Sequence, residues 1–170
     1  AHPGLAPMLV GVPGGGVSWA PQPGSAFHAD FTVVVRIKDS RGREADRLSQ
    51  DYKLSVAADR LEGARRGDIL FYREASIPPG RYTAEAVAYD AIARTASVRS
   101  EAFEVASAEG DRLRLSSLVL VRRAEKLTAA EQKERKPLHF GEAYLYPSLG
   151  APFKRSAVPA LGYFFSVYGK

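Results

Sequence analysis

The chain has 170 residues, of which 45% are hydrophobic and 25% are charged, and it contains no cysteine. These proportions are typical of a globular protein with one domain, or with one small domain and part of another. The missing cysteines exclude disulfides, thiolate zinc sites and cysteine nucleophiles. The formal net charge of +5 permits contact with anionic partners but carries no information about the fold.

Residues 1–26 are rich in glycine and proline and include the run Gly14-Gly15-Gly16. This composition predicts an irregular arm, and its apolar residues 9–12 leave open a short strand at a sheet edge. The glycine run is not a phosphate-binding loop, because no Gly-Lys-Ser/Thr sequence follows it.

The clearest pattern in the chain is the alternation of apolar and polar side chains over residues 27–38, which predicts a strand with one face in a core. Asp39 and Gly42 occupy the first and fourth positions that a type I turn favours. A short helical turn is expected over residues 61–66. Further strands are expected over residues 48–56, 69–74, 81–90 and 96–105, with a bulge in the last. Residues 27–106 therefore predict a β-sandwich domain.

The remaining segment, residues 113–170, predicts a C-terminal β extension. Residues 113–121 alternate, and strands are also expected over 143–146 and 163–168, the last of them apolar on both faces. Thr128 and Glu131 have the spacing of a capping box and predict one short helix over residues 128–136. Because so few strands cannot cover their own apolar faces, we expect this segment to pack on the sandwich or against another copy of the chain, or to begin a second sandwich.

A turn motif refines the fold class. The sequence Pro79-Gly80-Arg81-Tyr82 resembles the turn into the penultimate strand of immunoglobulin-like and fibronectin type III-like domains. The resemblance implies that Tyr82 lies at a corner, with its hydroxyl bonded to backbone upstream of Pro78. The expected fold is therefore an all-β, immunoglobulin/fibronectin type III-like sandwich.

A longer resemblance rests on five blocks, which are residues 30–34 (DFTVV), 47–50 (RLSQ), 64–74 (ARRGDILFYRE), 113–123 (LRLSSLVLVRR) and 145–150 (LYPSLG). They are similar to the C-terminal region of large exported bacterial proteins, common in acidobacteria, that also carry a von Willebrand factor A-related domain. The resemblance implies an accessory β-sandwich in an extracellular, periplasmic or cell-surface location. The chain has no Asp-x-Ser-x-Ser metal motif, so the resemblance implies no metal site here.

Few polar patterns indicate chemistry. His28 and Asp30 share the outward face of one predicted strand, where a metal site or an acid–base pair would need a third group, so a solvated face is expected. The tripeptide Arg66-Gly67-Asp68 is expected to be a charged loop. Basic residues are interleaved with acidic ones, which disfavours nucleic-acid binding. No Gly-x-Ser-x-Gly elbow occurs, and no apolar run approaches the roughly 18 residues of a membrane span.

Aromatic residues concentrate near the C-terminus, and the interface candidates among them are Tyr144, Tyr146, Tyr163, Phe165 and Tyr168. The leading hypothesis is a non-catalytic structural or interaction module that binds neighbouring domains, another protein or a second copy of itself. The alternative is a carbohydrate- or peptide-binding module that uses these aromatics, and a hydrolytic enzyme is the third class. No metal or cofactor is expected.

Overall fold

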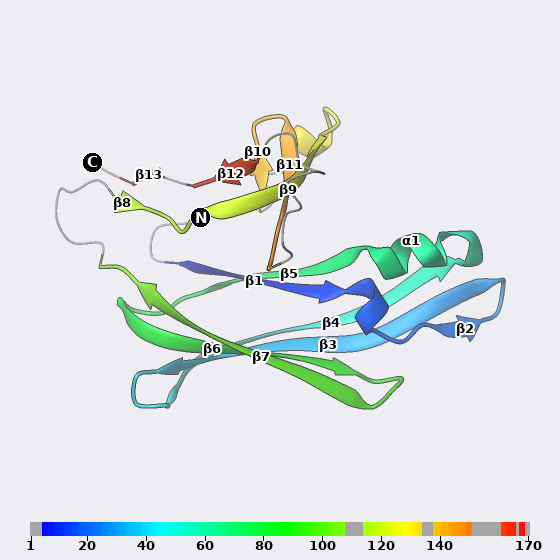
Figure 1. Cartoon of the computed structure of the whole chain (residues 1–170), viewed down its shortest axis with the longest axis horizontal. Helices are drawn as coiled ribbons and strands as arrows, with labels where there is room; N and C mark the ends of the chain where they lie inside the picture. Colours follow the sequence, from blue (N-terminus) through cyan, green and yellow to red (C-terminus); the bar gives the residue numbers. More distant parts are fainter. Residues whose placement is uncertain (1–4, 108–113, 134–137, 151–160, 166, 169–170) are drawn as a thin grey trace. The chain divides into compact units, whose positions relative to one another are not determined.

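The computed structural model describes residues 5–107, 114–133, 138–150, 161–165 and 167–168. The chain divides into two compact units, Ala1–Ala108 and Glu109–Lys170, here called the N-terminal unit and the C-terminal unit. Strands dominate both units, and the α-helical part of the described residues is the short α1 (Leu61–Arg66). The expectation of an all-β sandwich fold is therefore confirmed (Figure 1).

The larger layer of the N-terminal unit is a five-stranded antiparallel sheet. Its strands are β2 (Ala20–Gln22), β3 (Ala26–Asp39), β4 (Glu44–Ala57), β6 (Gly80–Asp90) and β7 (Thr95–Val105). The central strand β3 pairs with β4 on one edge and with β2 and then β6 on the other, and β7 continues the sheet beyond β6. Asp39 accepts hydrogen bonds from the backbone of Arg41 and Arg43 and so closes the turn between β3 and β4.

The second layer consists of β1 (Ala6–Pro13) and β5 (Asp68–Ala75), which pair antiparallel with Val10 opposite Phe71. Alternation directs one row of each layer inward, and the five largest side chains less than 2% exposed form the centre of the core: Phe31, Val33, Val35, Ile37 and Phe71. The Tyr52 ring stacks on Phe31 with centroids 4.8 Å apart. Burial of apolar surface between the two layers is thus what holds the sandwich together.

The irregular arm predicted over residues 1–26 is wrong, because β1 and β2 both lie in sheets, whereas the short strand left open over residues 9–12 is present as part of β1. Val12 and Val17 belong to the buried core. The run Gly14–Gly16 forms a single 3-10 turn, η1. There the backbone of Gly14 approaches α1 so closely that an added Cβ would lie 2.0 Å from the carbonyl oxygen of Ala64. Glycine and proline content concealed a period of two in the apolar residues of β1.

The bulge expected in the strand over residues 96–105 is also absent. The pairing of β6 with β7 runs without a register shift from Gly80–Val105 to Asp90–Thr95. The apparent change of phase arises because β7 is an edge strand, where Val98 is 66% exposed on the outer face and Phe103 packs against the core. An edge strand is held by its backbone pairing and needs little apolar periodicity.

The corner motif surrounds a buried tyrosine. Tyr82 is 7% exposed, its hydroxyl donates a 2.8 Å hydrogen bond to the carbonyl oxygen of Pro78, and its ring stacks on Phe103. Pro79 forms a bend and Gly80 begins β6, so Tyr82 lies close enough to the bend for its hydroxyl to reach Pro78. The acceptor is Pro78 itself, whereas the sequence analysis expected a residue upstream of it.

Asp90, at the end of β6, ties distant parts of the N-terminal unit together. Its carboxylate accepts hydrogen bonds from the backbone N–H groups of Ser18 at 2.6 Å and of Ile92 and Ala93 at 2.9 Å. Burial acts to raise the pKa of Asp90, but these N–H donors outweigh it and the net pKa lies below its ordinary value. The ionised side chain thus joins the β1–β2 connection to the β6–β7 turn.

The C-terminal unit contains a sheet in the order β10-β11-β9-β12 and a separate pair of strands, β8 and β13. Their bounds are β8 (Arg114–Leu115), β9 (Val119–Lys126), β10 (His139–Phe140), β11 (Ala143–Pro147), β12 (Gly162–Phe164) and β13 (Val167–Tyr168). The strand predicted over 113–121 is therefore interrupted, and the one predicted over 163–168 is divided between two sheets.

The helix predicted over residues 128–136 is a single 3-10 turn, η3 (Glu131–Lys133). The capping box is present, because the Glu131 carboxylate accepts from the backbone N–H of Thr128 at 2.9 Å. Residues 134–137 lie outside the described part of the chain. A capping box defines where a helix starts, but its length depends on tertiary contacts.

We expect the hydrogen bonds to the Asp90 carboxylate to make the free energy of unfolding of the N-terminal unit depend on pH. Since the pKa of Asp90 is lower in the folded state, its stabilisation is present above the pKa of about 3.9 in the unfolded chain and is lost as pH falls through the folded value. Urea unfolding at pH 7 should show a loss of about 1–2 kcal/mol for Asp90→Asn. The difference from the unsubstituted chain should shrink towards pH 2.

The control for this prediction is Asp59→Asn, which removes an exposed carboxylate of the 3-10 turn η2 (Ala58–Arg60). It should leave the unfolding free energy nearly unchanged at both pH values. Parallel pH profiles for Asp90→Asn and the unsubstituted chain would contradict the role assigned to Asp90.

The C-terminal unit should not fold alone. Among its described residues only Leu127 is buried, at 7% exposure, so little apolar surface is removed from water within the unit. A polypeptide of residues 109–170 is expected to show no cooperative thermal transition by circular dichroism, whereas residues 1–108 should show one. A cooperative melt of the monomeric C-terminal polypeptide would contradict this expectation.

Candidate functional site

The C-terminal sheet gathers aromatic and charged side chains along two paired strands. Register places Tyr144 opposite Glu125 and Tyr146 opposite Arg123, so these side chains share one face. The two tyrosine rings meet edge to face with centroids 4.7 Å apart, and His139 contacts Tyr144 in the same manner at 5.5 Å. We call His139, Tyr144 and Tyr146 the tyrosine row.

The charged side chains beside the tyrosine row, Arg123 and Glu125, already interact with each other and with Tyr146. The guanidinium carbon of Arg123 lies 3.8 Å from the centroid of the Tyr146 ring, a cation–π contact. Arg123 also pairs with Glu125, and the Tyr146 hydroxyl donates to Glu125 Oε2 at 2.7 Å. The hydrogen bond to Glu125 is the main cause that raises the pKa of Tyr146 above its ordinary value, so the phenol stays neutral and acts as a donor.

A second group of rings faces solvent. Tyr163 is 60% exposed and Phe165 is 39% exposed, and their rings stack within 9° of parallel at a centroid distance of 6.2 Å. Phe140 is 61% exposed and meets the Phe164 ring edge-on at 5.3 Å, which brings together β10 and β12 from the two outer positions of the sheet. Since Phe164 points to the opposite face of β12 from Tyr163, Phe140 lies on that other face, and we call only Tyr163 and Phe165 the exposed rings.

Exposed apolar side chains are concentrated in this unit. Ten large hydrophobic residues are exposed in the described part of the chain, and all except Tyr89 and Val98 belong to the C-terminal unit. Isolated surface hydrophobics are normal, but such a concentration in one small unit is typical of a contact surface.

The interface candidates predicted from the sequence fall into three places. Tyr144 and Tyr146 lie in the tyrosine row, and Tyr163 and Phe165 belong to the exposed rings. Tyr168 lies in β13, in the separate two-stranded sheet. Sequence reasoning missed three participants: Arg123, His139 and Phe140. No local motif marks them, because strand pairing between distant residues brings them to the aromatics.

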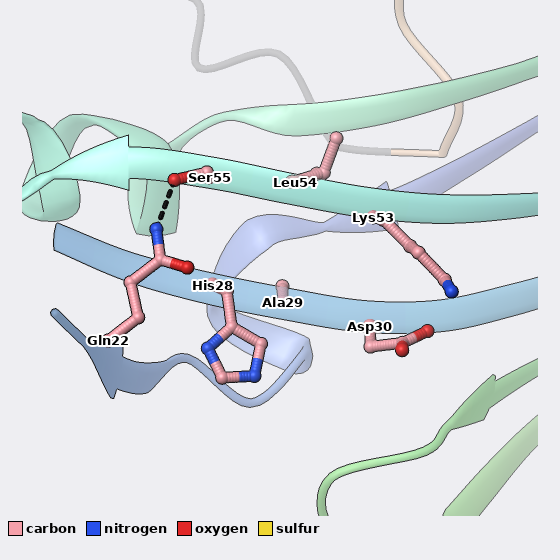
Figure 2. Close-up of a pocket in the computed structure, with 7 residues that line it drawn as sticks. All are labelled: Gln22, His28, Ala29, Asp30, Lys53, Leu54 and Ser55. Carbon is pink, nitrogen blue, oxygen red and sulfur yellow. Dashed lines mark hydrogen bonds between the residues drawn. The ribbon is translucent and has the colours of Figure 1, made fainter.

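The N-terminal unit has a shallow depression on the outer side of β2, β3 and β4 (Figure 2). His28 is flanked there by Gln22 and Ser55, whose side chains hydrogen-bond to each other, and Asp30 lies opposite Lys53. The Nδ1 atom of His28 is buried without a hydrogen-bond partner. His28 and Asp30 thus share a face, and within the described residues no group of three or more histidines and carboxylates is placed to hold a metal ion.

In the part of the chain that the structure describes, no helix is both long and apolar enough to cross a membrane. Comparison of the chain with protein-family models, with curated proteins and with solved structures gives no match. The resemblances stated from the sequence therefore stay predictions.

Proposed function

We propose that the chain is a non-catalytic interaction module and that the exposed rings of its C-terminal unit contact another protein domain. The proposal rests on the exposure of the stacked Tyr163 and Phe165 rings, which share one face of the sheet, within a unit whose described residues bury so little else. Rings held in water lose the free energy that burial would supply, about 1.5–3 kcal/mol for a large side chain. A partner surface that covers them recovers it.

The chemistry of the surface supports protein contact. Aromatic residues and arginine are enriched at the centres of interfaces, and here Tyr146 and Arg123 pack together in the same sheet that carries the exposed rings. Stacking also fixes the ring orientations before binding, so less conformational entropy is lost when a partner docks. Since Arg123, Glu125 and Tyr146 bond to one another, they are arranged to support a surface rather than to transfer protons.

The N-terminal unit supports a role as the scaffold. Its strand order β4-β3-β6-β7 against β1-β5, together with the Tyr82–Pro78 bond, favours the immunoglobulin/fibronectin type III-like assignment that the turn motif suggested. Domains of this architecture serve many functions, so the fold does not select the partner. From the sequence resemblance we infer a neighbouring domain of an exported bacterial protein as that partner.

A second candidate function is glycan binding. The specific observation in its favour is the nearly parallel Tyr163–Phe165 stack, since flat exposed rings also serve as platforms for sugar faces. This candidate requires binding of soluble oligosaccharides, which the protein-contact proposal does not.

The test is calorimetric titration of the chain with the polypeptides that flank it in its gene, each produced separately. The double variant Tyr163→Ser/Phe165→Ser should weaken binding by roughly 30-fold or more, as expected when central contact residues are truncated. The matched control is Tyr89→Ser, which removes an exposed ring from the N-terminal unit and should leave the affinity unchanged. The heat capacity of binding should be negative.

Equal affinity of the double variant and the unsubstituted chain would overturn the proposal. If instead cellohexaose or chitohexaose binds the chain and the double variant loses that binding, the glycan-binding function replaces it.

A further inference from the structure

We propose that the free edge of β1 binds an extended, uncharged strand of another polypeptide, which lies over the inner faces of β6 and β7. This site is in the N-terminal unit and uses backbone hydrogen bonds. It is therefore independent of the exposed rings and of the function proposed for them.

The hydrogen-bonding register of β1 with β5 determines which backbone N–H and C=O groups of β1 point to its free edge. The backbone N–H of Gly14 donates to the carbonyl oxygen of Gly67 at 2.8 Å, and this pair continues the register in which Pro13 faces Asp68. In an antiparallel ladder, hydrogen-bonded pairs alternate with pairs that are not hydrogen-bonded. The even-numbered residues of β1 therefore bond to β5, and Leu9 and Gly11 direct their N–H and C=O groups to the opposite edge.

The free edge is bounded by two prolines. Pro7 and Pro13 have the same phase as Leu9 and Gly11 but carry no N–H group. Proline in a strand is tolerated where its missing N–H faces away from the ladder, which is the case here. No charged residue occurs between Leu5 and Phe27, so the usual protection of an edge by charge is missing. Within the described residues, β1 has no strand partner besides β5.

The opposite edge of this small sheet is occupied. By the same phase the carbonyl oxygen of Leu70 in β5 points away from β1, and it accepts a hydrogen bond from the Tyr52 hydroxyl at 3.3 Å. Burial is the main cause that raises the pKa of Tyr52 above its ordinary value, so this hydroxyl keeps its proton. A strand can therefore add to β1 but not to β5 at this position.

The surface next to the free edge is formed by the inner faces of β6 and β7, which we call the floor. Ala84, Ala86 and Ala88 of β6 are only half-buried although they point towards the core side. Their partners across the pairing in β7, Glu101, Arg99 and Ser97, are exposed. Alanine side chains are short, and sheets pack about 10 Å apart, so the space above them suits large apolar side chains.

Charge favours a neutral occupant. The edge itself is uncharged, and Arg99 and Glu101 neutralise each other through a 2.9 Å ion pair on the floor. A charged strand would find no opposite charge to pair with and would lose hydration. The matching ligand is thus an extended segment with large apolar side chains at alternate positions, bound by strand addition.

A second copy of this chain does not fit the same edge. Pairing β1 with the β1 strand of another copy would place the two small sheets side by side. The floor strands β6 and β7 extend past β1, as the exposure of their inner face indicates, so the floors of the two copies would occupy the same space. A single strand has no such floor and can lie over the alanines.

The test uses a synthetic peptide in which leucine alternates with threonine over seven uncharged residues, with two lysines beyond each end of this segment for solubility. Titration should shift the amide resonances of Leu9 and Gly11 and slow their hydrogen exchange. Leu9→Pro removes an outward N–H without removing a bond to β5, and it should weaken binding roughly tenfold or more. Leu9→Thr keeps the N–H and should bind as the unsubstituted chain does.

A measurement on the free chain needs no variant to fold. In the monomer the amides of Leu9 and Gly11 should exchange rapidly, whereas those of Val10 and Val12 should be protected. Protection of Leu9 in the free monomer, equal peptide affinity of Leu9→Pro, or peptide-induced shifts confined to other strands would each overturn the proposal. A β1-dependent dimer in sedimentation would replace the peptide strand with a second copy.

Discussion

The N-terminal unit depends on the burial of the inward-facing side chains of β3 between the five-stranded sheet and the β1–β5 pair. Phe31, Val33, Val35 and Ile37 are at most 1% exposed, and each contributes about 1.5–3 kcal/mol when it is fully removed from water. This burial requires β1 in place, since Val12 closes part of the same core. The Gly14 contact with α1 and the Asp90 bond to Ser18 hold the chain on either side of Val17.

The two units differ in how much apolar surface they bury and therefore in what they expose to a partner. The N-terminal unit buries its apolar residues efficiently but leaves one strand edge and part of one inner face uncovered, so it offers backbone groups to a partner. The C-terminal unit pairs its strands with little burial and leaves rings in solvent, so it offers side chains. Backbone pairing selects an extended conformation, whereas exposed rings select a complementary surface. The two modes can serve different partners.

The sequence was sufficient where local pattern and tertiary role agree. Alternation over residues 27–38 predicted β3, and the Asp39–Gly42 spacing predicted its turn, because both depend on neighbouring residues only. The full extent of β1 escaped prediction, beyond the short strand left open over residues 9–12, because proline and glycine usually indicate irregular structure. Only the pairing with β5 shows that its prolines lie on the unpaired edge. The interruption after Leu115 likewise depends on pairing with β13, which no local pattern records.

The same limit applies to the candidate site. Aromatic density near the C-terminus identified Tyr144, Tyr146, Tyr163 and Phe165, yet it could not pair them or add Arg123, since residues about twenty positions apart meet there through strand register. The uncovered edge of β1 was also invisible, because an edge is defined by what does not pair with it. Only the arrangement of strands reveals it.

The sandwich depends most on β1, the strand that the Gly/Pro-rich N-terminal segment adds to the core. The most direct test compares the unfolding free energies of Val12→Asp and Pro13→Asp, adjacent positions of which only Val12 is buried. We expect a loss of about 3 kcal/mol or more for Val12→Asp, because a carboxylate would enter the core, and a change within about 0.5 kcal/mol for the exposed Pro13→Asp. Equal and small effects at both positions would mean that residues 6–13 are an arm outside the core, and would contradict this dependence on β1.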